Sequence, residues 1–190
     1  MIAFKGFHNN FQCTMGKGTF QYEVGKTYEE KECKCTANGF HCCENPLDVL
    51  DYYSGPHDRY AVVKAEGDIN QDACGTKIAC TKMTILKEIT RLELGAYGCD
   101  YIRKYPDREI TSKNLYMDKG KCNASSDFVI VRGKKPRAAA VAGGCFFLLI
   151  EEPDSPEIKD IYVYCANGTD AKPNTYYTIR EGRLCEEKNC

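Results

Sequence analysis

The chain has 190 residues, of which 43% are hydrophobic and 28% are charged, and its formal net charge is −1. The length predicts one domain, or a larger domain with a small appendage, and the composition is typical of a globular protein. The near-neutral charge gives no bulk attraction to nucleic acid, and no apolar run approaches the ~20 residues that span a bilayer. The N-terminus shows no export signal, so we expect a cytoplasmic protein without a membrane partner.

The first half of the chain mixes strand patterns with one clear helix pattern. Strands are predicted over residues 1–6, 20–24, 60–65 and 77–88. The residues of the last strand that should face inward are Ile78, Cys80, Met83 and Ile85, with one bulge between them. A helix is predicted over residues 90–105, and Pro106 ends it.

A second, shorter helix is predicted in the middle of residues 39–53. Asn45 is a suitable N-cap, and Pro46 fits the first helical position, where its missing N–H is not needed. Leu47, Leu50 and Tyr53 then recur on one helical face. We expect a strand or turn to lead through Gly39 into this helix.

The second half changes to short strands that are separated by glycine turns. Strands are predicted over residues 128–131, 138–142, 145–151, 158–165, 176–179 and 183–185. Asn167-Gly168 and Glu181-Gly182 are typical of hairpin turns. We therefore predict an α+β fold: an antiparallel sheet with two main helices, followed by a β-hairpin-rich C-terminal part. The predicted divisions are residues 1–106, a polar connector over 107–126, and residues 127–190.

Thirteen cysteines are the unusual feature of the composition. Because the number is odd and no export signal is present, we expect reduced thiols that fill small apolar spaces. A zinc site is an alternative, since Cys33, Cys35, His41, Cys42 and Cys43 lie close together and are zinc ligands by type. However, the spacing is not the usual C-x₂-C, and adjacent residues on a strand point apart. No metal is therefore favoured.

Several segments carry a family resemblance in a fixed order. They are residues 4–7, 20–26, 39–53, 60–67, 143–145, 148–151 and 172–179, followed by Gly182 and Leu184. Together they resemble an uncharacterised family of phage and prophage proteins. The resemblance implies a viral or mobile-element origin and the bacterial host cytoplasm as the place of action. It implies no catalytic residues.

A second series of short segments follows the same order along the chain as in ADP-ribosyltransferases, which it resembles. It runs through residues 4–6, Gly25, residues 39–41, Tyr52-Tyr53 and residues 60–65. Lys5 stands where those enzymes have Arg or His, and the catalytic Glu cannot be assigned, with Glu66 and Glu88 as the nearest acidic residues. This resemblance implies an NAD-using or nucleotide-binding pocket near His41. The common phosphate-loop, dinucleotide, zinc-helix and nucleophile-elbow motifs are absent from the sequence.

Two groups of residues are candidates for binding. His41, Tyr52 and Tyr53 belong to the central segment, and four basic residues follow later in a run that suits a solvated hairpin loop. These four are Arg132, Lys134, Lys135 and Arg137. A nucleophilic cysteine beside His41 or His57 is conceivable by residue type.

We expect a phage or prophage accessory protein that binds a host bacterial protein, for example as an inhibitor of host antiviral defence of the anti-CRISPR kind. The alternatives are a nucleotide-binding or ADP-ribosyltransferase-like protein with NAD as cofactor, and a structural appendage of the virion.

Overall fold

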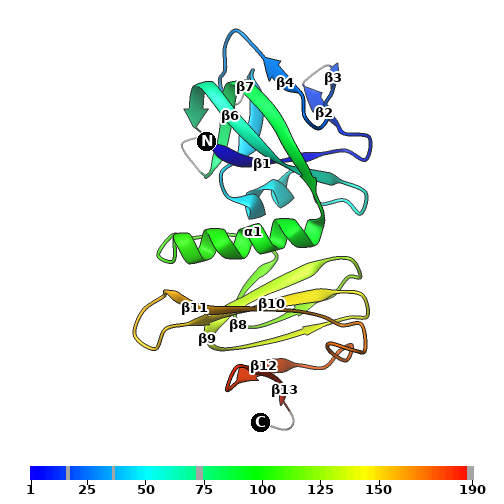
Figure 1. Cartoon of the computed structure of the whole chain (residues 1–190), viewed down its shortest axis with the longest axis vertical. Coiled ribbons are helices and arrows are strands. Elements are labelled where there is room, and N and C mark those ends of the chain that lie inside the picture. The colour runs from blue at the N-terminus through cyan, green and yellow to red at the C-terminus, as the bar shows by residue number, and fades with distance from the viewer. Residues whose placement is uncertain (16–17, 36, 72–74, 188–190) are drawn as a thin grey trace. The chain divides into compact units, whose positions relative to one another are not determined.

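Strands dominate the structure, which is a computed structural model that describes residues 1–15, 18–35, 37–71 and 75–187 (Figure 1). Strands account for 51% of it and helices for 12%, with three sheets and two helices in the described ranges. The prediction of an α+β fold with two main helices is therefore wrong. The chain divides into two units, Met1–Leu94 and Gly95–Cys190.

Unit 1 is built from a main β-sheet, the two-stranded sheet β2–β3 and one short helix. Its elements are β1 (Ile2–Phe7), β2 (Gln12–Met15), β3 (Gly18–Gln21), β4 (Thr27–Glu29), β5 (Phe40–Cys43), the 3-10 helix η1 (Pro46–Asp51), β6 (Arg59–Gln71) and β7 (Lys77–Ile89). Helix α1 (Arg91–Lys104) begins at the end of this unit and agrees with the helix predicted over residues 90–105.

The main sheet of unit 1 closes on itself. Its antiparallel strands follow the order β4-β7-β5-β1-β6, and β6 also pairs with β7, so the pairings complete a ring. Two register shifts between β6 and β7 let these long strands bend around the ring. One of them lies beside Gly67, which has a positive φ of 73° and continues a strand that we expected to end there.

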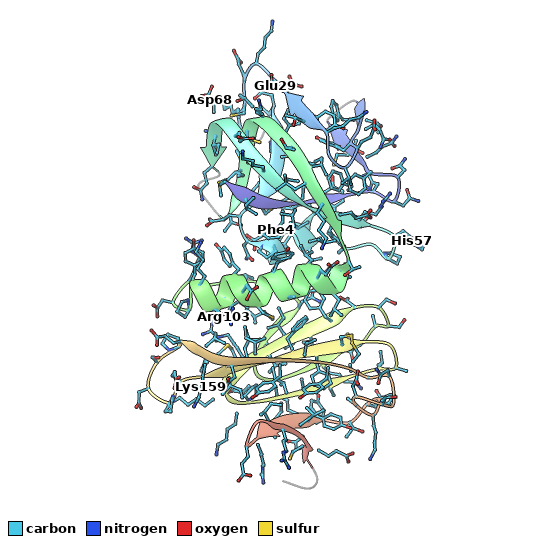
Figure 2. The ribbon with its side chains drawn as sticks, viewed as in Figure 1. Phe4, Glu29, His57, Asp68, Arg103 and Lys159 are labelled. Atoms are coloured by element: carbon cyan, nitrogen blue, oxygen red, sulfur yellow. A yellow bond between two sulfur atoms is a disulfide. The ribbon has the colours of Figure 1, made fainter. Side chains whose placement is uncertain are left out.

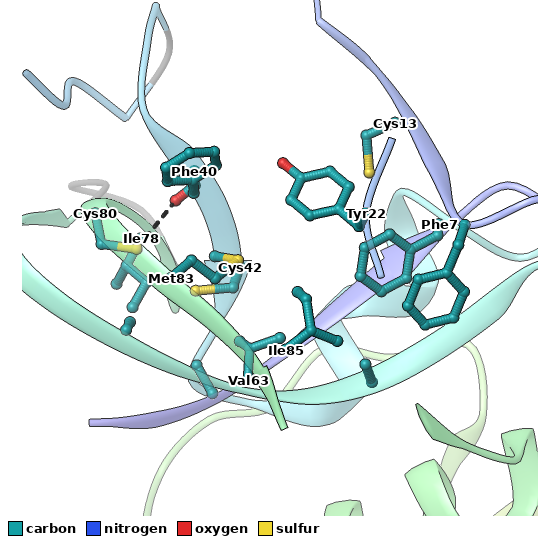
Figure 3. Close-up of a cluster of buried hydrophobic side chains, with 14 residues drawn as sticks. Phe7, Cys13, Tyr22, Phe40, Cys42, Val63, Ile78, Cys80, Met83 and Ile85 are labelled. Carbon is teal, nitrogen blue, oxygen red and sulfur yellow. Dashed lines mark hydrogen bonds between the residues drawn. The ribbon is translucent and has the colours of Figure 1, made fainter. Parts of the chain in front are cut away.

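The inside of the ring is filled by apolar side chains. Ile78, Cys80, Met83 and Ile85 are all buried, as predicted for β7. Aromatic rings from β1, β5 and the loop after β3 complete the cluster; these are Phe7, Phe40 and Tyr22 (Figure 3). The predicted use of reduced cysteines as apolar fillers is confirmed at Cys13, Cys42 and Cys80, which belong to the same cluster.

The predicted middle helix is only six residues long. As expected, Asn45 is its N-cap, and the Asn45 side chain accepts a hydrogen bond from the Leu47 N–H at 3.1 Å. The Tyr52 N–H donates to the Val49 carbonyl, three residues back, which is the hydrogen-bond pattern of a 3-10 helix. So short an element cannot be a main helix of the fold.

Unit 2 is a second, mixed sheet. Its strands are β8 (Leu115–Cys122), β9 (Phe128–Ala140), β10 (Cys145–Glu151), β11 (Ile158–Cys165), β12 (Tyr177–Arg180) and β13 (Arg183–Glu186). They follow the order β11-β10-β9-β12-β13, and β8 pairs with β9. The bounds of β10 and β11 agree with the prediction, and Glu181-Gly182 forms the expected hairpin turn with positive φ at both residues. The hairpin predicted at Asn167-Gly168 is wrong, because β11 and β12, the strands on either side of it, do not pair with each other.

The basic run in residues 132–137 is not the solvated loop that we expected. It lies inside β9, where the register with β8 shifts from Met117↔Arg132 to Lys119↔Arg137. Gly133 permits this bend, because a Cβ at its position would lie 2.4 Å from the Asp118 side chain. Gly133 and Pro136 therefore lie inside a long strand, although the sequence pattern predicts a loop at these two residues.

One pair of cysteines departs from the expected reduced state. Cys145 and Cys165 lie directly opposite each other on β10 and β11 and form a disulfide. Opposite positions on antiparallel strands bring the Cβ atoms close enough for this bond. The expectation of reduced thiols throughout is thus wrong for these two residues. Cys74 and Cys190 lie outside the described residues.

Candidate functional site

The ring of unit 1 has one weak seam, between β1 and β5. These strands pair only at Phe4↔Cys43, whereas β1 pairs with β6 over its whole length. Beyond that pair the two strands separate, and a cavity of about 360 Å³ opens between them. Cys42 of β5 lines this cavity, as do Cys13 of β2 and Tyr22 after β3. Figure 3 shows the same three residues in the buried cluster. We call this space the seam cavity.

Lys5 crosses the seam. Its side chain follows the inward-facing positions of β1, and the residue is only 6% exposed. The Lys5 Nζ donates a hydrogen bond to the His41 carbonyl at 2.7 Å, and it lies 5.1 Å from the centre of the Tyr22 ring. Among the described residues, Lys5 forms no ion pair. A buried ammonium group without a counter-ion is costly and suggests a function.

His41 lies across the seam from Lys5. Its Nε2 is buried and has no hydrogen-bond partner in the described part of the chain. Whichever ring nitrogen carries the proton, the Nε2 is a polar atom with which a ligand can form a hydrogen bond. Burial, followed by the charges of Lys5 and Lys77, lowers the pKa of His41 below its usual value, so the ring is neutral at pH 7.

Tyrosine rings form the apolar walls. Burial raises the pKa values of both Tyr22 and Tyr53, so both are neutral phenols. Tyr53 packs against Gly6, where an added Cβ would lie only 2.4 Å from the tyrosine ring. Tyr52 is 55% exposed, and the Lys77 Nζ lies 4.8 Å from the centre of its ring. The predicted group of His41, Tyr52 and Tyr53 thus comes together at one cavity.

The charge of the seam cavity is entirely positive. Lys5 and Lys77 both line it, and none of the described residues that line it is Asp or Glu. Lys77, like Lys5, forms no ion pair within the described ranges. Two ammonium groups, an unpartnered imidazole nitrogen and tyrosine rings are suited to an anion that carries hydroxyl groups.

The cysteines suggested for zinc do not come together. Cys42 belongs to the interior cluster, whereas Cys43 pairs with Phe4 at the seam, and burial raises the pKa of Cys43 to about 12. Cys33 and Cys35 donate to backbone carbonyls of Asp68 and Lys77. Among the described residues, no group of three or more Cys, His, Asp or Glu side chains is arranged to hold a metal ion.

The other enzyme candidates also lie away from the cavity. Glu66 pairs with Lys64, and Glu88 with Arg59, and neither glutamate lines the seam cavity. His57 is exposed and projects from the loop before β6 (Figure 2).

The basic residues of unit 2 have mixed roles. Arg132 is buried and pairs with Glu151 at 2.7 Å, so it acts in packing. Arg137 pairs with Glu187 at 3.0 Å. Lys134 and Lys135 are exposed and line a separate open hollow of unit 2.

Comparison with known proteins identifies the first unit. The family described as a domain of unknown function (DUF7666) matches residues 1–96, which covers the ring of unit 1 and its seam cavity. The chain belongs to this family. No curated protein and no solved structure matches the chain. None of the helices in the described DUF7666 protein is both long and apolar enough to cross a membrane.

Sequence reasoning named Lys5 of this DUF7666 site only as a departure from the ADP-ribosyltransferase pattern and did not name Lys77. A signal for Lys5 was nevertheless present, because it stands between Ala3 and Phe7, which face inward on the same strand. Lysine is rarely buried without a partner. A lysine at an inward-facing position therefore indicates either a functional buried charge or that the strand prediction is wrong. Lys77 carried no such signal, since it is the first residue of a long strand.

Proposed function

We propose that unit 1 of this DUF7666 protein binds a small phosphate-bearing molecule of the nucleotide type in the seam cavity. The observation that carries the proposal is the buried Lys5 ammonium group, which has no counter-ion among the described residues and lies across the seam from the unpartnered Nε2 of His41. A phosphate would supply the missing negative charge, and a sugar hydroxyl, which can donate or accept, would form a hydrogen bond with the His41 Nε2.

The size of the cavity supports a mononucleotide rather than a whole dinucleotide. At about 360 Å³, the seam cavity lies near the lower end of the roughly 300–1,000 Å³ that is typical of ligand sites. The tyrosine rings supply apolar and stacking surface for a sugar or base. We favour binding over catalysis, because none of the described residues that line the cavity is the carboxylate that an ADP-ribosyl transfer would need.

Calorimetric titration of the full chain tests the proposal. The probes are AMP, ADP, NAD, ribose 5-phosphate, inorganic phosphate and adenosine. We expect AMP to bind at least tenfold more tightly than adenosine, since charge-assisted hydrogen bonds each contribute about 1.5–3 kcal/mol. Lys5→Met should remove this difference. Lys64→Met is the matched control, because Lys64 is half exposed on β6 and outside the cavity.

Either of two results would contradict the proposal. Adenosine binding as tightly as AMP would show that the phosphate is not recognised. Unchanged AMP affinity in Lys5→Met would place the phosphate somewhere other than at Lys5.

We propose, second, that the chain acts as a phage or prophage accessory protein that binds a host protein in the bacterial cytoplasm. The family resemblance of its segments supports this setting, and the exposed ring of Tyr52 supports a protein contact at the central segment. A pull-down from bacterial lysate with the full chain should capture one stoichiometric protein, and Tyr52→Ala should weaken the capture. Equal capture by Tyr52→Ala would contradict this surface, and Tyr116→Ala in unit 2 is the control.

A further inference from the structure

Two of the three histidines of the chain line the seam cavity. His41 lies on β5, and His8 directly follows the end of β1, so the two imidazole rings come from the two strands that the seam separates. Lys5 and Lys77 line the same space. Two imidazole rings beside ammonium groups are the side chains that acid–base chemistry on a phosphate ester requires.

We infer that unit 1 cleaves short RNA phosphodiesters in the seam cavity, with His41 as the general base and His8 as the general acid. The inference rests on the proposed phosphate-binding function and adds a reaction at that phosphate. An ADP-ribosyl transfer would need a carboxylate in the cavity, whereas attack of a ribose hydroxyl on its own phosphate needs a base, an acid and cations. Because the whole chain is nearly neutral, we expect a dinucleotide or short oligonucleotide as substrate rather than long RNA.

The ribose 2′-hydroxyl is the nucleophile of this reaction. Its oxygen attacks the neighbouring phosphorus while its proton passes to His41. The bond from phosphorus to the 5′-oxygen breaks, and His8 donates a proton to that oxygen. The products are a 2′,3′-cyclic phosphate and a free 5′-hydroxyl, so no water or other co-reactant is consumed. Lys5 and Lys77 stabilise the negative charge that builds on the phosphoryl oxygens.

The surroundings of His41 suit a general base. Burial, followed by the charges of Lys5 and Lys77, lowers the pKa of His41, so the ring is neutral at pH 7 and can take up a proton. Its Nε2 is buried and has no hydrogen-bond partner in the described part of the chain. The polar hydrogen atom nearest to this nitrogen in a complex would therefore belong to the substrate.

The surroundings of His8 suit a general acid that a carboxylate holds in place. Its Nδ1 lies 3.9 Å from the Asp58 Oδ1, and its Nε2 lies 3.5 Å from the hydroxyl oxygen of Thr14, which also lines the cavity. The Gly55 N–H donates to the Asp58 Oδ2 at 2.7 Å and fixes the carboxylate. Asp58 is thus a positioning residue, which directs the Nε2 of His8 towards the cavity.

The space beside the seam cavity suits the second nucleoside of a dinucleotide. The seam cavity, at about 360 Å³, has room for one nucleotide. A second hollow of about 1020 Å³ shares Thr14, Gly39, His41 and Lys77 with it. The wall of this hollow carries both glutamate and lysine side chains, so we expect little preference for one base over another.

Incubation of the full chain with the RNA dinucleotide UpA and its 2′-deoxy analogue dUpA tests the inference, with the products identified by mass. UpA should give uridine 2′,3′-cyclic phosphate and adenosine, and dUpA should stay intact. His8→Gln and His41→Gln should each slow the cleavage by about 10²–10⁴-fold. His57→Gln is the matched control, because the third histidine is exposed and does not line the cavity (Figure 2).

The pH dependence of kcat/KM distinguishes the acid from the base. The wild-type profile should be bell-shaped. His41→Gln should remove the fall on the acidic side, and His8→Gln should remove the fall on the alkaline side. His8 is half exposed, so its replacement should leave the fold intact. Asp58→Asn should lower kcat and leave KM nearly unchanged, because the ring loses its orientation while the phosphate keeps its contacts.

The outcomes separate this inference from the function on which it rests. AMP binding that depends on Lys5, without cleavage of UpA, would overturn the inference and leave the phosphate site standing. Cleavage of dUpA, or equal cleavage of UpA by the wild type and by both His8→Gln and His41→Gln, would overturn the mechanism. Failure both to bind AMP and to cleave UpA would overturn the inference and the proposed function together.

Discussion

Replacement of Lys5 by methionine should stabilise unit 1 while it abolishes phosphate binding. The buried ammonium group costs several kcal/mol of desolvation, because it has no counter-ion among the described residues. Against this stand one charge-assisted hydrogen bond, of roughly 1.5–3 kcal/mol, and cation–π contacts of about 0.5–2 kcal/mol. Methionine keeps the length and apolar contacts of the side chain. We therefore expect the free energy of unfolding to rise by about 1 kcal/mol.

Urea denaturation followed by circular dichroism measures this change, and calorimetry should show the melting temperature of unit 1 rising by roughly 4–8 °C. Lys64→Met, at a half-exposed position, should change the free energy of unfolding by less than about 0.5 kcal/mol. A loss of 2 kcal/mol or more in Lys5→Met would refute the reasoning. It would mean that Lys5 is chiefly a structural link between β1 and β5.

Three further predictions concern packing and pH. Gly6→Val should lower the free energy of unfolding by about 1–3 kcal/mol and weaken AMP binding, because the new side chain displaces Tyr53; a thermal melt and a titration measure both. Arg132→Met should cost about 3–5 kcal/mol in urea denaturation by leaving the Glu151 carboxylate buried and unpaired, and adding Glu151→Leu should recover most of this loss. Because the pKa of His41 is lowered in the folded state, the unfolded chain binds more protons below about pH 6.5, so stability should fall on acidification from pH 7 to 5. His41→Gln should flatten that slope in denaturation curves measured at each pH.

The predicted strands were most accurate where the sequence carries a continuous apolar run between clear breaks. The bounds of β10 follow from such a run after Gly143-Gly144, and the pattern of β7 identified its buried residues. The prediction failed where a glycine or proline stands inside a bent strand. Gly67 and Gly133 have positive φ angles at shifts of register, and only the pairing with a neighbouring strand distinguishes such a bend from a turn.

The candidate site could be predicted only in part for a related reason. His41, Tyr52 and Tyr53 are close in sequence, so the turn before η1 was enough to bring them together. Lys5 and Lys77 reach the same cavity from other strands, and their meeting depends on which strands pair at the seam. The order of strands in a sheet depends on contacts between residues far apart in the sequence, so a local sequence pattern does not predict it.

Because only one residue pair joins β1 to β5, local opening of the closed sheet should occur first at the seam. Backbone amides along an unzipped edge exchange their hydrogens with water faster than those inside the long β6–β7 ladder. A molecule that contacts both sides of the seam would link β1 to β5, reduce the opening of the two strands and so slow the exchange. Deuterium uptake along β1 and β5 would then report occupancy of the cavity even in a crude extract, before the occupant has been identified.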